Sequence, residues 1–117
     1  MIRLITAAAL CCAVCVPASA ETCEASQYGV GDGYHGRRTA SGARFNTYAD
    51  DPFTVAHRRH AFGTMLMITH LGNGRSIRAR VTDRGPFYPG RCVDVGRAGA
   101  NALGMGGTAR VRVEVLP

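Results

Sequence analysis

Fifteen glycines and five prolines are spread along the whole of this 117-residue chain and are not gathered into a linker. Glycine is the default residue where a turn needs a positive φ, and proline pre-sets the start of many turns. Turns at this frequency leave room only for short strands between them. We therefore expect one all-β domain built from short strands, without internal repeats.

Five segments have the character of strands. The clearest is 109–116, in which valines alternate with charged residues at a period of two. The other strand candidates are 23–28, 65–70, 76–81 and 92–95. Asn73-Gly74 predicts a hairpin turn between two of them, because this dipeptide supplies positive φ values. Residues 97–103 predict a short helix that ends at Gly104. The pattern indicates an all-β barrel with a helical insertion.

Residues 1–20 have the pattern of a removable secretion signal. Arg3 precedes an apolar run over 4–16, and Ala18-Ser19-Ala20 is the small-x-small pattern read by signal peptidase. The run is shorter than the roughly 20 residues that a spanning helix needs, which disfavours the alternative of a membrane anchor. No cysteine in it follows a lipoprotein-type sequence. We expect residues 21–117 to be exported to the periplasm or the cell exterior, without stable membrane insertion.

Two cysteines, Cys23 and Cys92, remain in residues 21–117. In an oxidising compartment such a pair predicts a disulfide, and small exported domains often need one. It would close a loop of about 70 residues and stabilise the fold by roughly 4 kcal/mol in the chain-entropy model. A nucleophilic cysteine or a metal ligand is the alternative, disfavoured because the spacing is not that of a metal site.

The chain is basic, and every one of its 14 basic residues is arginine. Without Arg3, 13 arginines against 8 acidic residues leave a formal charge of +5. Such a charge favours an anionic partner, unless it serves only to keep the protein soluble. Tryptophan is absent and aromatic residues are few, so we expect no nucleic-acid partner. An acidic cell-wall polymer or a membrane surface fits an exported domain better.

Asp83 ends a predicted strand, and the Gly85-Pro86 that follows turns the chain away. This places a carboxylate near the barrel surface, where a ligand can reach it. The alternative is an aspartate that accepts backbone hydrogen bonds in the turn or pairs with Arg84. His57 is similarly open to a structural role or a role in proton transfer.

Asp94 lies between two valines and should point away from both if the segment is a strand. It either lines the same cavity as Asp83 or is a buried acceptor. Because a buried unpaired carboxylate is unfavourable, we expect a partner such as Arg91 or a backbone amide. We favour a supporting role for Asp94.

Seven short motifs occur in order over residues 24–116: 25–29, 35–42, 56–58, 62–64, 73–76, 83–87 and 90–94. In these motifs the chain resembles the RlpA family, and more distantly expansins and barwin-like proteins. The resemblance implies a six-stranded double-psi β-barrel with one or two short helices. It also implies lytic cleavage of peptidoglycan glycan strands, with a preference for strands stripped of their stem peptides.

The resemblance carries site residues onto this sequence. The family's proposed catalytic aspartate falls on Asp83 and its active-site histidine on His57. The family's glutamate is replaced by Ala43, and 46–54 is longer than usual, so Asp50 or Asp51 could supply a carboxylate instead. Thr39 and Asp94 would support the site. Four arginines would face carboxylates of the wall, for which planar guanidinium is suited: Arg37, Arg38, Arg58 and Arg84.

A single carboxylate is sufficient for a lytic transglycosylase. A hydrolase ordinarily uses two carboxylates, but here the sugar's own 6-hydroxyl is the nucleophile. Asp83 could act first as acid and then as base, with His57 positioning it.

Because Ala43 replaces the glutamate, a non-catalytic expansin-like wall-binding module is the rival hypothesis. A barwin-like secreted defence protein is a third hypothesis. The histidines lack metal-ligand spacing. We expect a monomer without metal or cofactor.

Overall fold

The computed structural model describes residues 20–29, 31–48 and 52–117. The predicted leader, except for Ala20, and the alternative carboxylates Asp50 and Asp51 therefore lie outside the described residues. No helix in the described part of the chain has the length and apolar character needed to cross a bilayer. The described elements are β1 (Glu21–Gln27), β2 (Phe53–His57), β3 (Met65–His70), β4 (Ser76–Asp83), β5 (Arg91–Val95), α2 (Arg97–Leu103) and β6 (Thr108–Val115).

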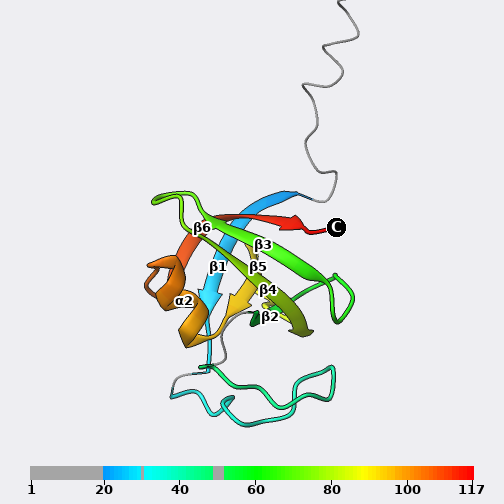
Figure 1. Ribbon diagram of the computed structural model, residues 1–117. Helices are drawn as coiled ribbons and strands as arrows, with labels where there is room; N and C mark the ends of the chain where they lie inside the picture. Colours follow the sequence, from blue (N-terminus) through cyan, green and yellow to red (C-terminus); the bar gives the residue numbers. More distant parts are fainter. Residues whose placement is uncertain (1–19, 30, 49–51) are drawn as a thin grey trace, which may run out of the picture.

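The six strands form one closed barrel in the order β1-β5-β2-β4-β3-β6 (Figure 1). Two neighbouring pairs, β1 with β5 and β2 with β4, are parallel, and the other four pairs are antiparallel. The short helix α2 connects β5 to β6 and packs against the outside of the barrel. The all-β, six-stranded barrel expected from the sequence is therefore confirmed.

Strand β2 is the element that periodicity did not predict. Val55, Ala56 and His57 are all buried, so side chains on both faces of this strand are covered. A strand covered on both faces shows no alternation of apolar and polar residues. The five predicted strands are all present, with ends shifted by up to two residues; β4, for example, continues to Asp83.

The barrel interior holds the hydrophobic core. Its fully buried members include Val55, Leu66, Ile68, Val93 and Val113, which come from four different strands. The disulfide between Cys23 and Cys92 is present, confirming the pairing predicted from composition. It joins β1 to β5 with 5.9 Å between the Cα atoms, and the two cysteines are 69 residues apart in sequence.

The hairpin between β3 and β4 forms as predicted, but not with the predicted geometry. Among the described residues only glycines have positive φ, so Asn73 does not adopt the left-handed conformation expected of it. Its side chain instead accepts a hydrogen bond from the Arg75 amide at 2.8 Å and donates one to the Leu103 carbonyl at 2.9 Å. Asn73 thus fastens the hairpin to the end of α2, and Gly74 alone carries the positive φ of the dipeptide.

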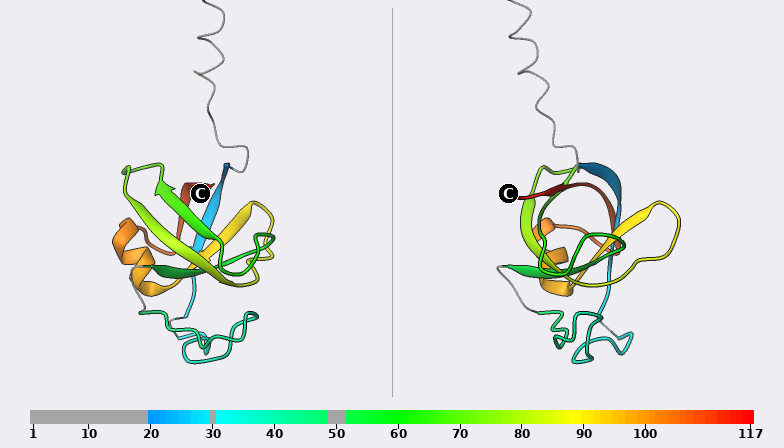
Figure 2. Two further views of the ribbon diagram at one scale, coloured as in Figure 1. Left: turned by 45° about the vertical axis from the view of Figure 1, so that its right-hand side comes forward. Right: turned by 90° about the vertical axis from the view of Figure 1, so that its right-hand side faces the viewer.

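The segment that contains residues 31–48 lies across one end of the barrel (Figures 1 and 2). Thr47 fastens it there: its hydroxyl donates to the Tyr28 carbonyl at 3.0 Å and accepts from the Arg97 amide at 2.7 Å. Phe45 is buried and stacks on Tyr28, with 4.3 Å between the ring centroids. These contacts hold this covering loop over the end of the barrel.

Candidate active site

A row of four paired residues crosses four neighbouring strands at this end of the barrel. Ser26 on β1 is paired with Asp94 on β5, and Asp94 is paired with Ala56 on β2. Ala56 is paired in turn with Asp83 on β4. Side chains of directly paired residues lie on the same face, and the next residue in a strand faces the other way. Since Val93 is fully buried in the core, the row lies on the outer face, with both carboxylates beside the small Ala56.

Asp83 lies at the end of β4, where the sequence predicted a strand end. One of its carboxylate oxygens, Oδ1, accepts hydrogen bonds from the amides of Ala40 and Arg84, both at 2.9 Å. The Ser41 amide also donates to the carbonyl of Thr82, at 3.1 Å. These contacts orient the carboxylate and tie it to the covering loop, so Asp83 both accepts backbone hydrogen bonds and stays partly exposed.

Asp94 has a different environment on the same face. The Ser26 hydroxyl donates to its Oδ1, so its hydrogen-bonding partner is neither the Arg91 side chain nor the backbone amide that we expected. Burial raises the pKa of Asp94, and the bond from Ser26 and the charge of Arg91 only partly oppose this. Asp83 adds to the increase in pKa through its negative charge. Asp94 therefore keeps its proton to a higher pH than an ordinary aspartate does.

Tyr28 is a site residue that sequence reasoning did not single out, although it lies in one of the family-like motifs. Its hydroxyl oxygen is buried and has no hydrogen-bond partner among the described residues. Burial, and then the charges of Asp83, Asp94 and Asp32, raise its pKa far above the ordinary value. The hydroxyl thus keeps its proton beside the two carboxylates.

A surface pocket of about 290 Å³ opens beside Asp94. It is lined by Ser26, Gln27, Tyr28, Tyr34, Gly85, Pro86, Phe87, Tyr88, Arg91 and Asp94. Phe87 and Tyr88, in the loop that projects between β4 and β5 in Figure 2, are 80% and 67% exposed. The Arg91 guanidinium lies over the Tyr88 ring, 4.9 Å from its centroid. Exposed aromatic faces next to the Asp94 carboxylate suit a polar ligand with apolar faces, such as a sugar ring.

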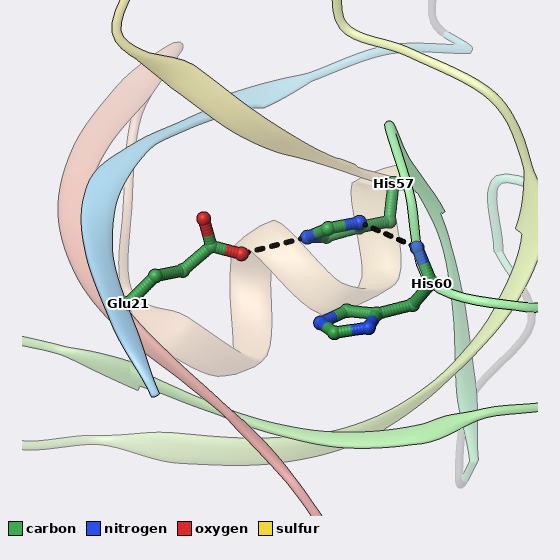
Figure 3. Close-up of side chains that lie close together, drawn as sticks. All are labelled: Glu21, His57 and His60. Carbon is green, nitrogen blue, oxygen red and sulfur yellow. Dashed lines mark hydrogen bonds and ion pairs between the residues drawn. The ribbon is translucent and has the colours of Figure 1, made fainter. Parts of the chain in front are cut away.

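His57 lies elsewhere. It is fully buried, faces the barrel interior, and its Nε2 is hydrogen-bonded to Glu21 Oε1 at 2.8 Å (Figure 3). Its Nδ1 accepts from the amides of Arg59 and His60 at 3.0 and 3.2 Å. Burial lowers the pKa of His57, and the Glu21 bond opposes this. The described hydrogen bonds include none between His57 and Asp83, so the direct positioning contact expected from the sequence is not observed.

The predicted substrate-facing arginines have different surroundings. Arg84 is used within the protein: its Nη1 donates to the carbonyls of His60 and His57 at 2.9 and 3.4 Å, and its guanidinium lies 4.1 Å from the centroid of the Phe62 ring. Arg58 is exposed. The expectation that Arg84 faces wall carboxylates therefore does not fit this geometry.

Arg37, Arg38 and Thr39 lie in the covering loop. Arg37 is exposed and lies over the Tyr34 ring at 5.5 Å, while Arg38 Nη1 donates to the Gly42 carbonyl at 2.8 Å. Thr39 is buried, and its hydroxyl bonds to the Ala43 carbonyl at 2.9 Å. Thr39 thus shapes the loop, whereas Ala43 is exposed and brings no carboxylate to the site.

The fold and the site define the class of protein: a double-psi β-barrel domain with a surface pocket lined by the Asp94 carboxylate and by aromatic rings. Residues 20–115 match the family model described as "Lytic transglycolase", and the chain belongs to this family. A protein of Nostoc sp. named "Probable endolytic peptidoglycan transglycosylase RlpA" is 51% identical over 94 residues, which cover 79% of this chain and 24% of that protein. The Campylobacter jejuni "Endolytic peptidoglycan transglycosylase RlpA" is 38% identical over 103 residues, which cover 86% of this chain and 36% of that protein.

The chain thus spans about a quarter to a third of the length of these relatives. Solved structures with this fold include an expansin and a papain inhibitor. The apo expansin of Clavibacter michiganensis has a TM-score of 0.63 at 20% identity, covering 84% of this chain and 50% of that one. The Streptomyces papain inhibitor has a TM-score of 0.64 at 16% identity, covering 86% of this chain and 97% of that one.

Proposed function

We propose that this domain is an exported peptidoglycan lytic transglycosylase that cleaves glycan strands, preferably peptide-free ones, to leave 1,6-anhydro-muramic ends. Membership of the lytic transglycolase family and the names of the relatives support the reaction class. The observation that carries the proposal is the pair of carboxylates, Asp83 and Asp94, on one face of the barrel, with Asp94 lining an aromatic-rimmed pocket. The second carboxylate makes up for the glutamate that Ala43 replaces.

Each carboxylate has one part of the proton transfer. Asp94, whose pKa is raised by burial, donates its proton to the glycosidic oxygen as the bond from that oxygen to C1 breaks. The 6-hydroxyl of the same sugar attacks C1, and Asp83 accepts the proton that this hydroxyl loses. The ring passes through an oxocarbenium-like state, which nearby negative charge stabilises. A proton returned to Asp94 from Asp83 through solvent completes the cycle.

The aromatic rim and the basic surface would hold the glycan. Phe87 and Tyr88 offer exposed ring faces to the apolar faces of sugars, and Tyr28 offers a buried hydroxyl proton to a substrate oxygen. Arg37 and Arg58 are exposed and remain candidates to bind lactyl or stem-peptide carboxylates. No metal or cofactor enters this mechanism.

Digestion of peptide-free glycan strands tests the proposal. We expect the protein to release anhydro-ended fragments, and Asp83→Asn and Asp94→Asn each to slow their release by about 100-fold or more, as loss of a general acid or base does. Glu114→Gln, a matched change of charge on β6 away from the pocket, should leave the rate unchanged. Product release at the wild-type rate by either aspartate variant would contradict the role of that residue.

A wall-binding module without activity is the second candidate, favoured by Ala43 at the position of the family's glutamate. The same samples distinguish it. If the folded protein is retained by purified sacculi but neither it nor the variants release anhydro-ended products, then binding is the function and the transglycosylase proposal is wrong.

Export is part of the proposal and rests on the sequence of residues 1–20. The expected product of processing begins at Glu21, the first residue of β1. Expression of the full chain in a host with a functional secretion pathway, followed by mass measurement of the exported protein, tests this. An intact Met1 or a membrane-retained protein would contradict cleavage.

A further inference from the structure

Glu21, His57 and His60 bring three metal-binding side chains together inside one end of the barrel (Figure 3). One ligand atom from each lies within 4.8 Å of the others. Glu21 is the first residue of β1, whereas the two histidines border the turn after β2. The set has one carboxylate and two imidazoles, the ligand set of many zinc sites with three protein ligands.

The hydrogen bonds of His57 leave one nitrogen available for a cation. Its Nδ1 accepts from two backbone amides, those of Arg59 and His60, so the proton of the neutral ring is on Nε2. That proton is donated to Glu21 Oε1 at 2.8 Å. A divalent cation can replace it, because the same nitrogen and oxygen would then both be ligands. The backbone bonds to Nδ1 already orient the ring, as the outer hydrogen bonds of metal-bound histidines do.

His60 supplies the third donor. Its Nε2 is buried and has no hydrogen-bond partner among the described residues. Its ring stacks on that of His57 with 4.3 Å between centroids and 30° between planes. Figure 3 shows one nitrogen of each ring on the side of Glu21. A buried imidazole nitrogen without a partner is unfavourable, and a bound cation would satisfy it.

We propose that Glu21, His57 and His60 form a Zn²⁺ site. Tetrahedral zinc with ligand bonds of about 2.0–2.1 Å needs donor atoms about 3.3 Å apart. His57 Nε2 and Glu21 Oε1, which are 2.8 Å apart, must therefore separate slightly, and the His60 nitrogen must adjust to both. His60 is only partly buried and lies on a turn, so its ring can rotate to do this. Arg59, whose guanidinium is 3.5 Å from the other Glu21 oxygen, is 61% exposed and can stay on that oxygen or turn to solvent.

The proposed zinc site and the carboxylate pair lie on opposite faces of the barrel wall, because His57 faces the interior whereas Ala56, beside the two carboxylates, faces outward. Glu21 and Ser26 are five residues apart on β1, which corresponds to about 17 Å along a strand. The cation would instead join the start of β1 to the turn over residues 57–60, whose carbonyls accept hydrogen bonds from Arg84. Zinc would therefore stabilise the turn over residues 57–60. This turn contacts Arg84, the residue that follows Asp83. The proposal does not depend on the catalytic function.

Calorimetric titration of the metal-free protein, prepared without a histidine tag, with Zn²⁺ tests the site. We expect one Zn²⁺ per chain and a higher Tm when it is bound, since a ligand that binds only the folded state stabilises it. His60→Ala should weaken binding by at least about tenfold, as loss of a zinc ligand should exceed the 10-fold to 100-fold effect of losing an outer partner. His70→Ala, at the β3–β4 hairpin, is the matched control and should bind as the wild type does.

Two results would overturn the proposal: no Zn²⁺ binding by the folded wild type, or equal binding by the wild type and His60→Ala. Glu21→Gln is a second variant that keeps a hydrogen bond to His57 but loses the carboxylate charge, and it should also weaken binding. Excess Mg²⁺ should not displace the zinc, because magnesium prefers oxygen ligands. Displacement by Mg²⁺ would show that the two imidazoles are not ligands.

Discussion

Asp83 and Asp94 are the same side chain in two environments. Two backbone amides donate hydrogen bonds to Asp83 and orient it. Asp94 instead accepts a hydrogen bond from the Ser26 hydroxyl, and its burial raises its pKa. Pairs of titratable groups whose environments differ are typical of acid–base sites. At the scale of the residue, the mechanism that we propose assigns each carboxylate its part in the proton transfer from its environment.

The raised pKa of Asp94 predicts how stability changes with pH. The folded protein holds the Asp94 proton more tightly than the unfolded chain, whose value is near 3.8. The stability that this group contributes is full below 3.8 and is lost as the pH rises through the raised pKa. Asp94→Asn should therefore gain stability relative to wild type as the pH rises over this range, measured by urea unfolding. A constant difference between the two proteins would contradict the shift.

Gly29 predicts a second effect at the residue scale. Its φ is +97°, and a Cβ there would lie 2.5 Å from the Phe45 ring. Gly29→Ala should thus lower the free energy of unfolding by about 2 kcal/mol or more, through strain and steric clash together. Gly106→Ala is the control, because a Cβ at that position has no atom within 4 Å and its φ is not positive. Chemical denaturation measures both variants, and equal losses would contradict this reasoning.

At the scale of the element, β1 is held from two directions. It pairs with β5 and β6, and the Cys23–Cys92 disulfide fastens it to β5. The parallel β1–β5 pair joins segments far apart in the sequence, with the two cysteines 69 residues apart, which a short turn cannot do. The covalent link therefore stabilises a long-range pairing that is costly in chain entropy.

Loss of the disulfide should have a large effect on stability. The double variant Cys23→Ala/Cys92→Ala should lose roughly 4 kcal/mol of unfolding free energy, because a closed loop of about 70 residues restricts the unfolded chain. Urea unfolding of the variant measures this, and the wild type in reducing agent should show a similar loss. A variant as stable as the oxidised wild type would contradict the estimate.

At the scale of the whole molecule, the charge is the property that acts at a distance. The full chain has a formal net charge of +6, and all of its basic residues are arginine. Such a charge attracts anionic polymers, and salt screens the attraction. Arg37, Arg38 and Arg58 are exposed and contribute to this field.

Binding to purified sacculi should therefore weaken as salt increases. We expect the retained fraction to fall several-fold between about 20 mM and 500 mM NaCl, a range over which the screening length shortens from more than 10 Å to less than 8 Å. Binding to an uncharged chitin oligomer is the control and should change little. Retention that is independent of salt would mean that the pocket, and not the charge, provides the affinity.

Much of this molecule was predictable from its sequence. Alternation indicated β6, glycine and proline indicated the turns around Gly74 and Gly104, and a lone cysteine pair indicated the disulfide, because these signals depend on local geometry or composition. The family-like motifs marked Asp83, His57 and Asp94 as residues of interest. Strand β2 was missed because its two buried faces show no alternation.

What the tertiary structure alone decided is which of these residues meet. Closure of the barrel in the order β1-β5-β2-β4-β3-β6 places Ser26, Asp94 and Asp83 in one row, although they come from three strands and Ser26 is far from the other two in sequence. The same closure turns His57 inward to Glu21, 36 residues earlier in the chain. Local sequence specifies turns and strands because these depend on neighbouring residues. Strand order and the face on which each side chain lies depend on long-range pairing, so the grouping of the site residues follows only from the folded barrel.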